Sequence, residues 1–324
     1  MLRVNRYSKR YKSEWNDFVN SAKNATFLFQ REFMEYHNDR FEDYSLMIFK
    51  GEKLIALLPA NINNGVLHSH QGLTFGGLLL STKATFENAL NAWKALLVFL
   101  EEQQFKTLQL KLIPKIYHLQ ASDEIDYLLF KLNAKNSRKD ITSVIISSNR
   151  LPIESSNRKR GIKKALKNDL IIEEVDDFKV FWKDVLIPNL QESHKAKPVH
   201  TASEITDLKS KFPNNIKQFN VFYNEETVAG VTIFETETVA HIQYISASSE
   251  GKKLGSLDFL INFLINEKYA QKKYFDFGIS NENQGKNINK GLLNWKESFG
   301  ARSVIHDFYE IETRNHLLLN DLFI

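Results

Sequence analysis

One stretch, residues 238–283, limits the folds open to this chain more than any other part of it. The segment TVAHIQYISA reads as a strand with apolar residues on both faces, which is typical of a strand inside a sheet. Leucine and isoleucine then recur at helical spacing up to Ile265, and a second strand is predicted at Tyr274–Ile279. Strand, helix and strand in this order form a crossover unit, in which ligands bind beyond the carboxyl ends of the strands.

Simple alternation divides the first strand into two faces. It places His241 and Gln243 on one face with Val239, Ile245 and Ala247. It places Tyr244 on the opposite face with Ala240, Ile242 and Ser246.

The segment between this strand and the helix predicts an anion site. It is interpreted as a loop whose two glycines allow close backbone approach and whose two lysines attract anions, and it leads into a helix with free N–H groups. If this tip were plugged by side chains, both the anion site and the function inferred from it below would lose their support. The candidate donor-binding residues are Ala247, Ser248, Gly251, Lys252, Lys253, Leu254, Gly255 and Ser256.

The order of predicted elements occurs twice along the chain. Each half gives helices, a three-strand meander, a glycine-bearing loop, a helix, a strand, a helix and a strand, and the first meander contains the hairpin signal Asn64-Gly65. The polar segment 148–156 interrupts the apolar pattern. We therefore predict a tandem duplication with domains at 1–150 and 151–324.

Composition excludes several classes of function. The chain has 324 residues, 43% of them hydrophobic, and no cysteine, so disulfides and zinc–thiolate sites are excluded. The histidines near His200 have no ligand spacing, so no metal site is predicted. A net charge of +4 permits an anionic ligand, and the absence of a signal-like start or a long apolar run favours a cytoplasmic protein without a membrane span.

The doubled order of elements resembles the GNAT acyltransferase fold as it is used twice in FemAB-like proteins. The segments that carry the resemblance are HSHQGLTFGG in the first half, and HKAKPVHT, VAGVTIF, HIQYISASSEGKKLGSLDFLINFLI and YFDFGISNENQGKNINKGLLNWKESFGA in the second. It implies an α/β (α+β) chain of two tandem GNAT-like domains, each with a mixed, mainly antiparallel central sheet flanked by helices. It also implies acyl transfer from acyl-CoA or aminoacyl-tRNA to an amine.

Two departures from the family pattern bear on the donor. The second half has no arginine in its loop and its glycines lie four residues apart, while the first half shows no anion-binding side chain near Gly76-Gly77. We therefore expect a donor only in the second half. The helical arm of tRNA-dependent members is missing. The basic stretch from Arg158 to Lys167 is the remaining candidate for contact with tRNA, although it is interpreted first as a helix whose charges face solvent.

Acyl transfer to an amine requires a route for the proton of the nucleophile. His241, Tyr244, Asp276 and His200 are the predicted catalytic residues, since histidine titrates near neutrality and a carboxylate on an interior strand needs a partner. Packing of His241 and Tyr244 in the core, and a structural hydrogen bond for Asp276, are the alternatives. Gln243, Asn281 and Asn283 are predicted to bind the acceptor, although a capped loop explains the asparagines equally well.

The sequence therefore supports an acyltransferase that acts on an amine, and the expected acceptor is an amino sugar or a cell-envelope or polysaccharide precursor. Acyl-CoA is the expected co-substrate, and no tightly bound cofactor is expected. A catalytically silent double-GNAT binding protein and an aminoacyl-tRNA-dependent transferase remain as alternatives.

Overall fold

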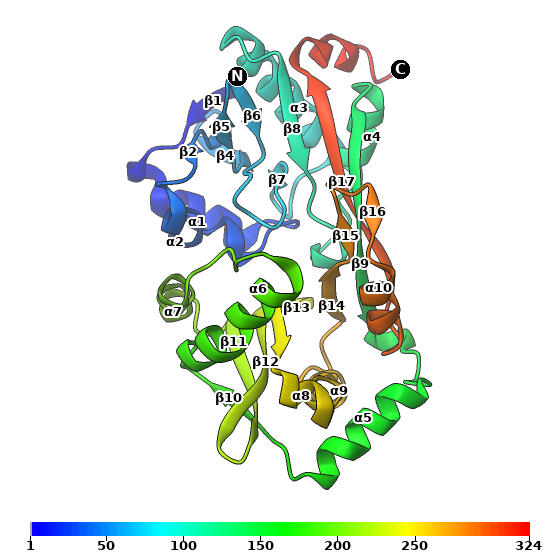
Figure 1. Cartoon of the computed structure of the whole chain (residues 1–324). Helices are drawn as coiled ribbons and strands as arrows, with labels where there is room; N and C mark the ends of the chain where they lie inside the picture. Colours follow the sequence, from blue (N-terminus) through cyan, green and yellow to red (C-terminus); the bar gives the residue numbers. More distant parts are fainter. Residues whose placement is uncertain (1) are drawn as a thin grey trace. The chain divides into compact units, whose positions relative to one another are not determined.

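The computed structural model describes residues 2–324, with the side chains of all of these except Ser193 and His194. The chain divides into two compact units, which are described separately (Figure 1). Unit 1 contains residues 2–140 and 305–324, and unit 2 contains residues 141–304. The predicted domain boundary at 150/151 lies inside unit 2, and the last twenty residues belong to unit 1 because β17 (Arg302–Glu312) pairs with a strand of that unit.

Unit 1 contains two groups of strands. The first has the order β1-β3-β4-β7 and is antiparallel throughout, and the second has the order β17-β8-β6-β5-β2. Asn64 and Gly65 have φ of +49° and +75° between β5 and β6, which confirms the predicted tight hairpin. The strands are β1 (Leu2–Arg6), β2 (Glu42–Asp43), β3 (Leu46–Lys50), β4 (Lys53–Leu58), β5 (Asn61–Asn63), β6 (Val66–His68), β7 (Leu79–Leu80) and β8 (Thr107–Lys111).

Helix α3 fills the centre of the core of unit 1. Its N-terminus is fixed by a capping box between Thr85 and Asn88, and its inner face buries Trp93 and Leu97 completely. The helices of unit 1 are α1 (Lys12–Ser21), α2 (Arg31–Met34), α3 (Phe86–Glu102) and α4 (Glu124–Lys131). α2 is short, because it ends at Met34 and the 3-10 turn Glu35–His37 follows it.

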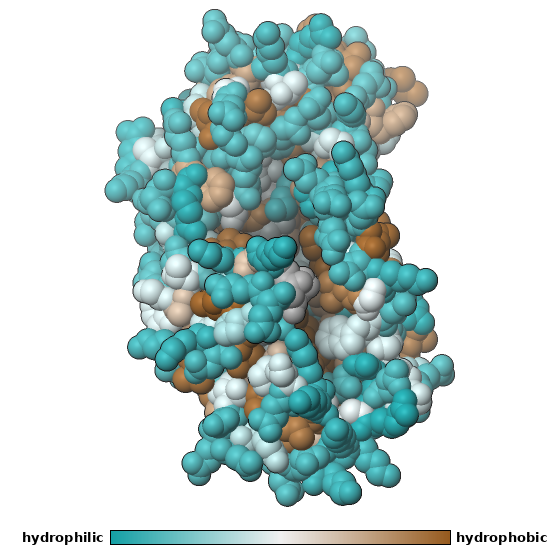
Figure 2. Space-filling view, in the orientation of Figure 1, coloured by the Kyte–Doolittle hydropathy of each residue, from teal (hydrophilic) through white to brown (hydrophobic). Residues whose placement is uncertain are grey.

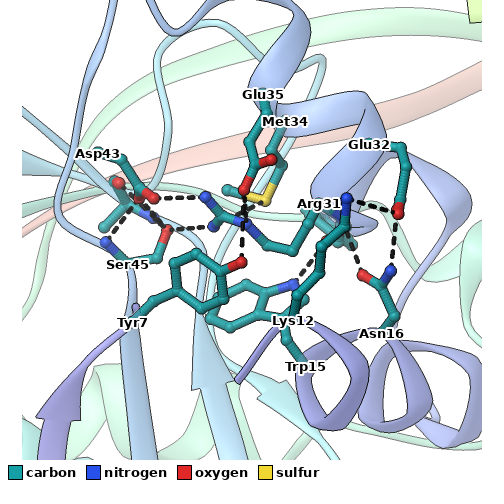
Figure 3. A network of polar contacts seen from close by, with 12 residues as sticks. Tyr7, Lys12, Trp15, Asn16, Arg31, Glu32, Met34, Glu35, Asp43 and Ser45 are labelled. Carbon is teal, nitrogen blue, oxygen red and sulfur yellow. Dashed lines mark hydrogen bonds and ion pairs between the residues drawn. The ribbon is translucent and has the colours of Figure 1, made fainter. Parts of the chain in front are cut away.

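A buried arginine organises the polar part of this unit (Figure 3). The Arg31 guanidinium donates to Asp43 at 2.5 Å and to Glu35 at 3.0 Å, and it lies 3.7 Å from the centre of the Tyr7 ring. Two carboxylates and an aromatic face thus compensate a side chain that is 2% exposed. This network is a structural feature of unit 1.

The main sheet of unit 2 is mixed and contains the strands β10-β11-β12-β13-β14-β9 in this order, while β15 and β16 form a separate antiparallel pair. All neighbours in the main sheet are antiparallel except β13 and β14, which are parallel and joined by a crossover through α8 and α9 (Figure 1). The strands are β9 (Lys135–Ile146), β10 (Ile171–Val175), β11 (Ile216–Tyr223), β12 (Glu226–Glu235), β13 (Val239–Ala247), β14 (Tyr274–Ile279), β15 (Asn281–Glu282) and β16 (Asn287–Ile288). The helices are α5 (Ser156–Lys167), α6 (Ile187–His194), α7 (Ala202–Lys211), α8 (Ser249–Leu254), α9 (Ser256–Phe263) and α10 (Lys290–Glu297), with π-helical turns at Phe181–Leu186 and Leu264–Lys268.

The two faces of the sheet in unit 2 differ in character. One face buries apolar side chains such as Val231, Ile242 and Phe275 with Leu260 and Leu264. The other face carries buried polar side chains, because the hydroxyl of Thr232 donates to Gln218, whose amide donates to Asn220. Among the helices of residues 2–324, none combines the length and apolar character needed to cross a membrane.

Candidate functional site

The parallel strands β13 and β14 are paired over only three residues. Val239–His241 pair with Tyr274–Asp276, and the register of β14 with β9 then shifts between Asp276 and Ile279. Gly278 lies in this irregular part with φ of +76°, a conformation that favours glycine. The strands therefore part immediately beyond His241 and Asp276, at the carboxyl ends where a crossover unit places its ligands.

A β-bulge in β13 corrects the predicted division of its side chains. Thr232 of β12 pairs with Tyr244 and Ile233 pairs with Ile242, so Gln243 is an extra residue in β13. Because the alternation restarts after the bulge, Tyr244 lies on the same face as His241 and not on the opposite one. Ile242 and Ala247 would lie on opposite faces of a regular strand. Both are in the apolar core on the other face, as the bulge requires.

His241 and Asp276 form a hydrogen-bonded pair at this point. The His241 Nδ1 lies 2.9 Å from the Asp276 Oδ2, and the other carboxylate oxygen accepts from the hydroxyl of Thr142 and from the N–H of Gly278 at 2.9 Å. The Asp276 side chain is fully buried, whereas that of His241 is 11% exposed. An ionised Asp276 holds the proton of His241 on Nδ1. The Nε2 of His241, the more accessible residue of the pair, is then left as a base.

Lys296 is part of this site although the sequence reading did not select it. It comes from α10, is 4% exposed, and donates from Nζ to the carbonyls of Gly278 and Ile279, both at 2.7 Å. Burial lowers the pKa of Lys296 to about 8, and the nearby charge of Asp276 opposes this shift. The sequence signal that could have indicated Lys296 is its position, because it directly follows Trp295 and lies on the apolar side of α10.

His200 and Tyr244 form a second pair within unit 2. The Tyr244 hydroxyl accepts from the backbone N–H of His200 at 3.1 Å and lies 2.6 Å from its Nδ1, to which it can donate. Trp182 packs edge-on against Tyr244 and donates to the His200 carbonyl. Burial raises the pKa of Tyr244 to about 12, so its hydroxyl keeps its proton at neutral pH. The four predicted catalytic residues are thus assembled as two pairs.

The predicted anion-binding loop is helical and its tip is covered. α8 begins directly after the strand, with the Ser248 hydroxyl accepting from the Gly251 N–H, and it has the acidic residue Glu250 in its first turn. A methyl group on Gly251 would lie 2.2 Å from the Val228 carbonyl oxygen, and one on Gly255 would lie 2.4 Å from that of Gly161. Both glycines therefore serve contacts within the protein, and the start of α9 packs against α5.

The other predicted donor-binding residues surround this closed tip. Ser256 is fully buried and donates to the carbonyl of Gly251, Ala247 is buried, and Leu254 is half-buried. Lys252 and Lys253 are exposed, and Lys252 contacts Asn189 at 2.5 Å. The start of α9 is therefore in contact with other residues of the chain.

The residues predicted to bind an acceptor have different surroundings. Gln243 is half-buried at the bulge beside His241 and Tyr244. Asn281 accepts from the backbone N–H of Ile141 at 2.5 Å, and Asn283 donates to Asn287 at 2.9 Å. Asn281 also donates to the carbonyl of Gly285 at 3.3 Å, so both asparagines have contacts within the β15–β16 hairpin. Among the described side chains, which do not include those of Ser193 and His194, no group of three histidine or acidic residues could hold a metal ion.

Comparison with solved structures identifies the fold. FemX superposes with a TM-score of 0.66 at 12% identity, covering 98% of this chain and 99% of that one. L-PGS from Bacillus licheniformis gives 0.61 at 10% identity, covering 96% and 94%. A tandem GNAT protein from the clavulanic acid biosynthesis pathway gives 0.50 at 11% identity, covering 97% and 99%.

These likenesses extend over nearly the whole chain, so the chain has a tandem GNAT-type fold that resembles both FemX and the tandem GNAT protein. A scan of family models and a search of curated proteins found no match to the sequence. At identities this low, the comparisons establish the fold and leave the activity to be argued from the site.

Proposed function

We propose that this chain transfers an acyl or aminoacyl group from an activated donor to an amine. The observation that carries the proposal is the His241–Asp276 pair, which lies where β13 and β14 part and has its imidazole as the accessible member. A carboxylate-oriented imidazole is a suitable general base near neutral pH. The fold supports the same class of reaction.

In the proposed reaction, the amine attacks the carbonyl carbon of the donor while Nε2 of His241 accepts a proton from its nitrogen. The C–N bond forms, the bond from the carbonyl carbon to the leaving sulfur or oxygen breaks, and the imidazolium returns the proton to the leaving group. Asp276 stabilises the imidazolium and fixes its orientation. The products are an amide and a thiol or alcohol, so no redox partner is required.

The covered start of α9 argues against a donor phosphate bound at that helix. The proposal therefore rests on His241 and Asp276, and it leaves both acyl-CoA and aminoacyl-tRNA as donors to be tested. An amino sugar or another cell-envelope precursor is the proposed acceptor, with the reaction placed in the cytoplasm.

The test combines a binding screen with a transfer assay. Wild type and the His241→Gln variant are incubated with labelled acetyl-CoA, longer acyl-CoA or aminoacyl-tRNA and a panel of amino sugars, and amide products are counted. We expect one donor class to raise the unfolding temperature of both proteins and to support transfer only by the wild type. Binding of a glycan or peptide without transfer from any donor would favour the silent binding protein instead.

A further inference from the structure

The most concentrated charge on unit 2 lies on α5, which Figure 1 shows at the edge of this unit beside α9. Five exposed cations recur along the helix with no acidic residue among them: Lys159, Arg160, Lys163, Lys164 and Lys167. At 3.6 residues per turn they occupy about 140° of the helix surface over a length of about 12 Å. We call these five residues the cationic stripe.

The opposite side of α5 is packed against α9, and this fixes the direction of the stripe. Arg158 pairs with Asp258, Ala165 is fully buried, and a methyl group on Gly161 would lie 2.0 Å from the Asp258 carboxylate. These contacts lie on the face opposite the stripe. The cations are therefore held outward, and the surface over α5 is largely hydrophilic (Figure 2).

The cations of the stripe are not neutralised by the protein. Throughout the described part of the chain, no ion pair joins any of the five to a carboxylate, although Arg160 contacts the side-chain oxygen of Asn157. This contrasts with Arg158 on the packed face and with Lys268, which is paired with Glu174 at 2.6 Å. A stripe of uncompensated cations is complementary to an anionic surface.

The residues beside the stripe favour one kind of anionic surface. Leu166, which follows Lys163 by three residues on α5, is 59% exposed. Four of the five cations are lysines, and α5 contains no aromatic residue on which a base could stack. Lysine clusters bordered by exposed aliphatic side chains are typical of contact with anionic phospholipid.

We infer that the cationic stripe and Leu166 dock this protein reversibly on a membrane surface rich in anionic phospholipid. The contact is electrostatic, with Leu166 entering the headgroup region, because the apolar face of α5 is already packed on α9. The inference depends only on charge and exposure, and it does not require the proposed acyl transfer.

The test measures partition of the full chain onto vesicles by sedimentation at low salt. One set of vesicles contains phosphatidylcholine alone and the other contains phosphatidylcholine with phosphatidylglycerol. The stripe variant is Lys159→Gln/Lys163→Gln/Lys167→Gln, and the control with the same charge change is Lys179→Gln/Lys183→Gln/Lys286→Gln, which alters three exposed lysines of unit 2 outside α5. Equal unfolding temperatures verify that both variants fold.

We expect wild type to bind only the anionic vesicles and to be released by added salt. At about fivefold for each cation lost, the stripe variant should bind on the order of a hundredfold more weakly, and the control less than fivefold more weakly. Equal losses in both variants, or no binding of wild type to anionic vesicles, would overturn the inference. Binding of tRNA that depends on the stripe, without vesicle binding, would also overturn it and assign the stripe to RNA.

Discussion

The Nδ1 of His241 lies 2.9 Å from the carboxylate of Asp276, and the two residues are also partners in the last paired position of β13 and β14. The ladder thus fixes the backbones of both residues while the hydrogen bond fixes the imidazole. Beyond them β13 and β14 are no longer paired, and the carboxyl ends of such strands are where a crossover unit places its ligands.

Replacing Asp276 by Asn should abolish most of the proposed transfer, because the amide does not stabilise the imidazolium. We expect the rate to fall by about 10²–10⁴-fold and the free energy of unfolding to fall by about 1–3 kcal/mol. The control is Thr142→Val, which removes one donor to Asp276 and keeps the carboxylate. Similar rate losses in both variants would indicate that Asp276 acts only through folding.

The lowered pKa of Lys296 predicts that the protein becomes more stable as the pH rises into the alkaline range. The pKa of Lys296 is lowered to about 8 in the folded protein, so between pH 8 and 10.5 the unfolded chain binds the proton that the folded protein has released. The contribution of Lys296 to the free energy of unfolding therefore rises with pH in that window and is lost as the pH falls through 8. Relative to Lys296→Met, wild type should gain about 2–3 kcal/mol between pH 8 and pH 10 in denaturant unfolding. Lys290→Met, at an exposed position of α10, is the control, and a flat difference for Lys296→Met would contradict the prediction.

Gly255→Ala should destabilise unit 2, because the new methyl group meets the backbone of Gly161 and φ at this position is +77°. We expect the free energy of unfolding to fall by about 2–4 kcal/mol. Gly291→Ala in α10 is the matched control, since the nearest atom to its methyl group lies at 3.6 Å. It should be neutral or stabilise by about 0.5–1 kcal/mol. Tolerance of alanine at Gly255 would mean that α5 does not pack closely on α9.

The lowered pKa of His70 predicts that the protein becomes less stable as the pH falls into the acid range. His70 is 2% exposed and stacks on His37 at 5.2 Å, and burial lowers its pKa to about 3. Below pH 6.5 the unfolded chain binds a proton that the folded protein does not, so stability present above pH 6.5 is lost as pH falls towards 3. Relative to His70→Asn, which tolerates the positive φ of +62°, wild type should lose about 2–3 kcal/mol between pH 7 and pH 4.5. Parallel stability curves for the two proteins would refute this assignment.

The long helices could be predicted from the sequence, because apolar patterns such as those of α3 and α9 repeat at helical spacing. The short helix α8 was instead interpreted as a loop. The sequence could not reveal the bulge at Gln243, since an inserted residue leaves no periodic signal of its own, and the faces of Tyr244 and His241 were therefore assigned wrongly. Glycines fit a phosphate-binding loop and a close helix contact equally well, and only the position of Gly161 distinguishes these roles for Gly255. Lys296 was missed because its partners are backbone carbonyls that no side-chain pattern records.

The most direct test of the account is the single-turnover rate of amide formation by wild type and His241→Gln, measured with the best donor and acceptor from the screen. Both proteins should bind the donor with equal affinity, and the variant should form the amide at least about 10²-fold more slowly. Equal rates in the two proteins would contradict the assignment of His241 as the base and, with it, the proposed mechanism.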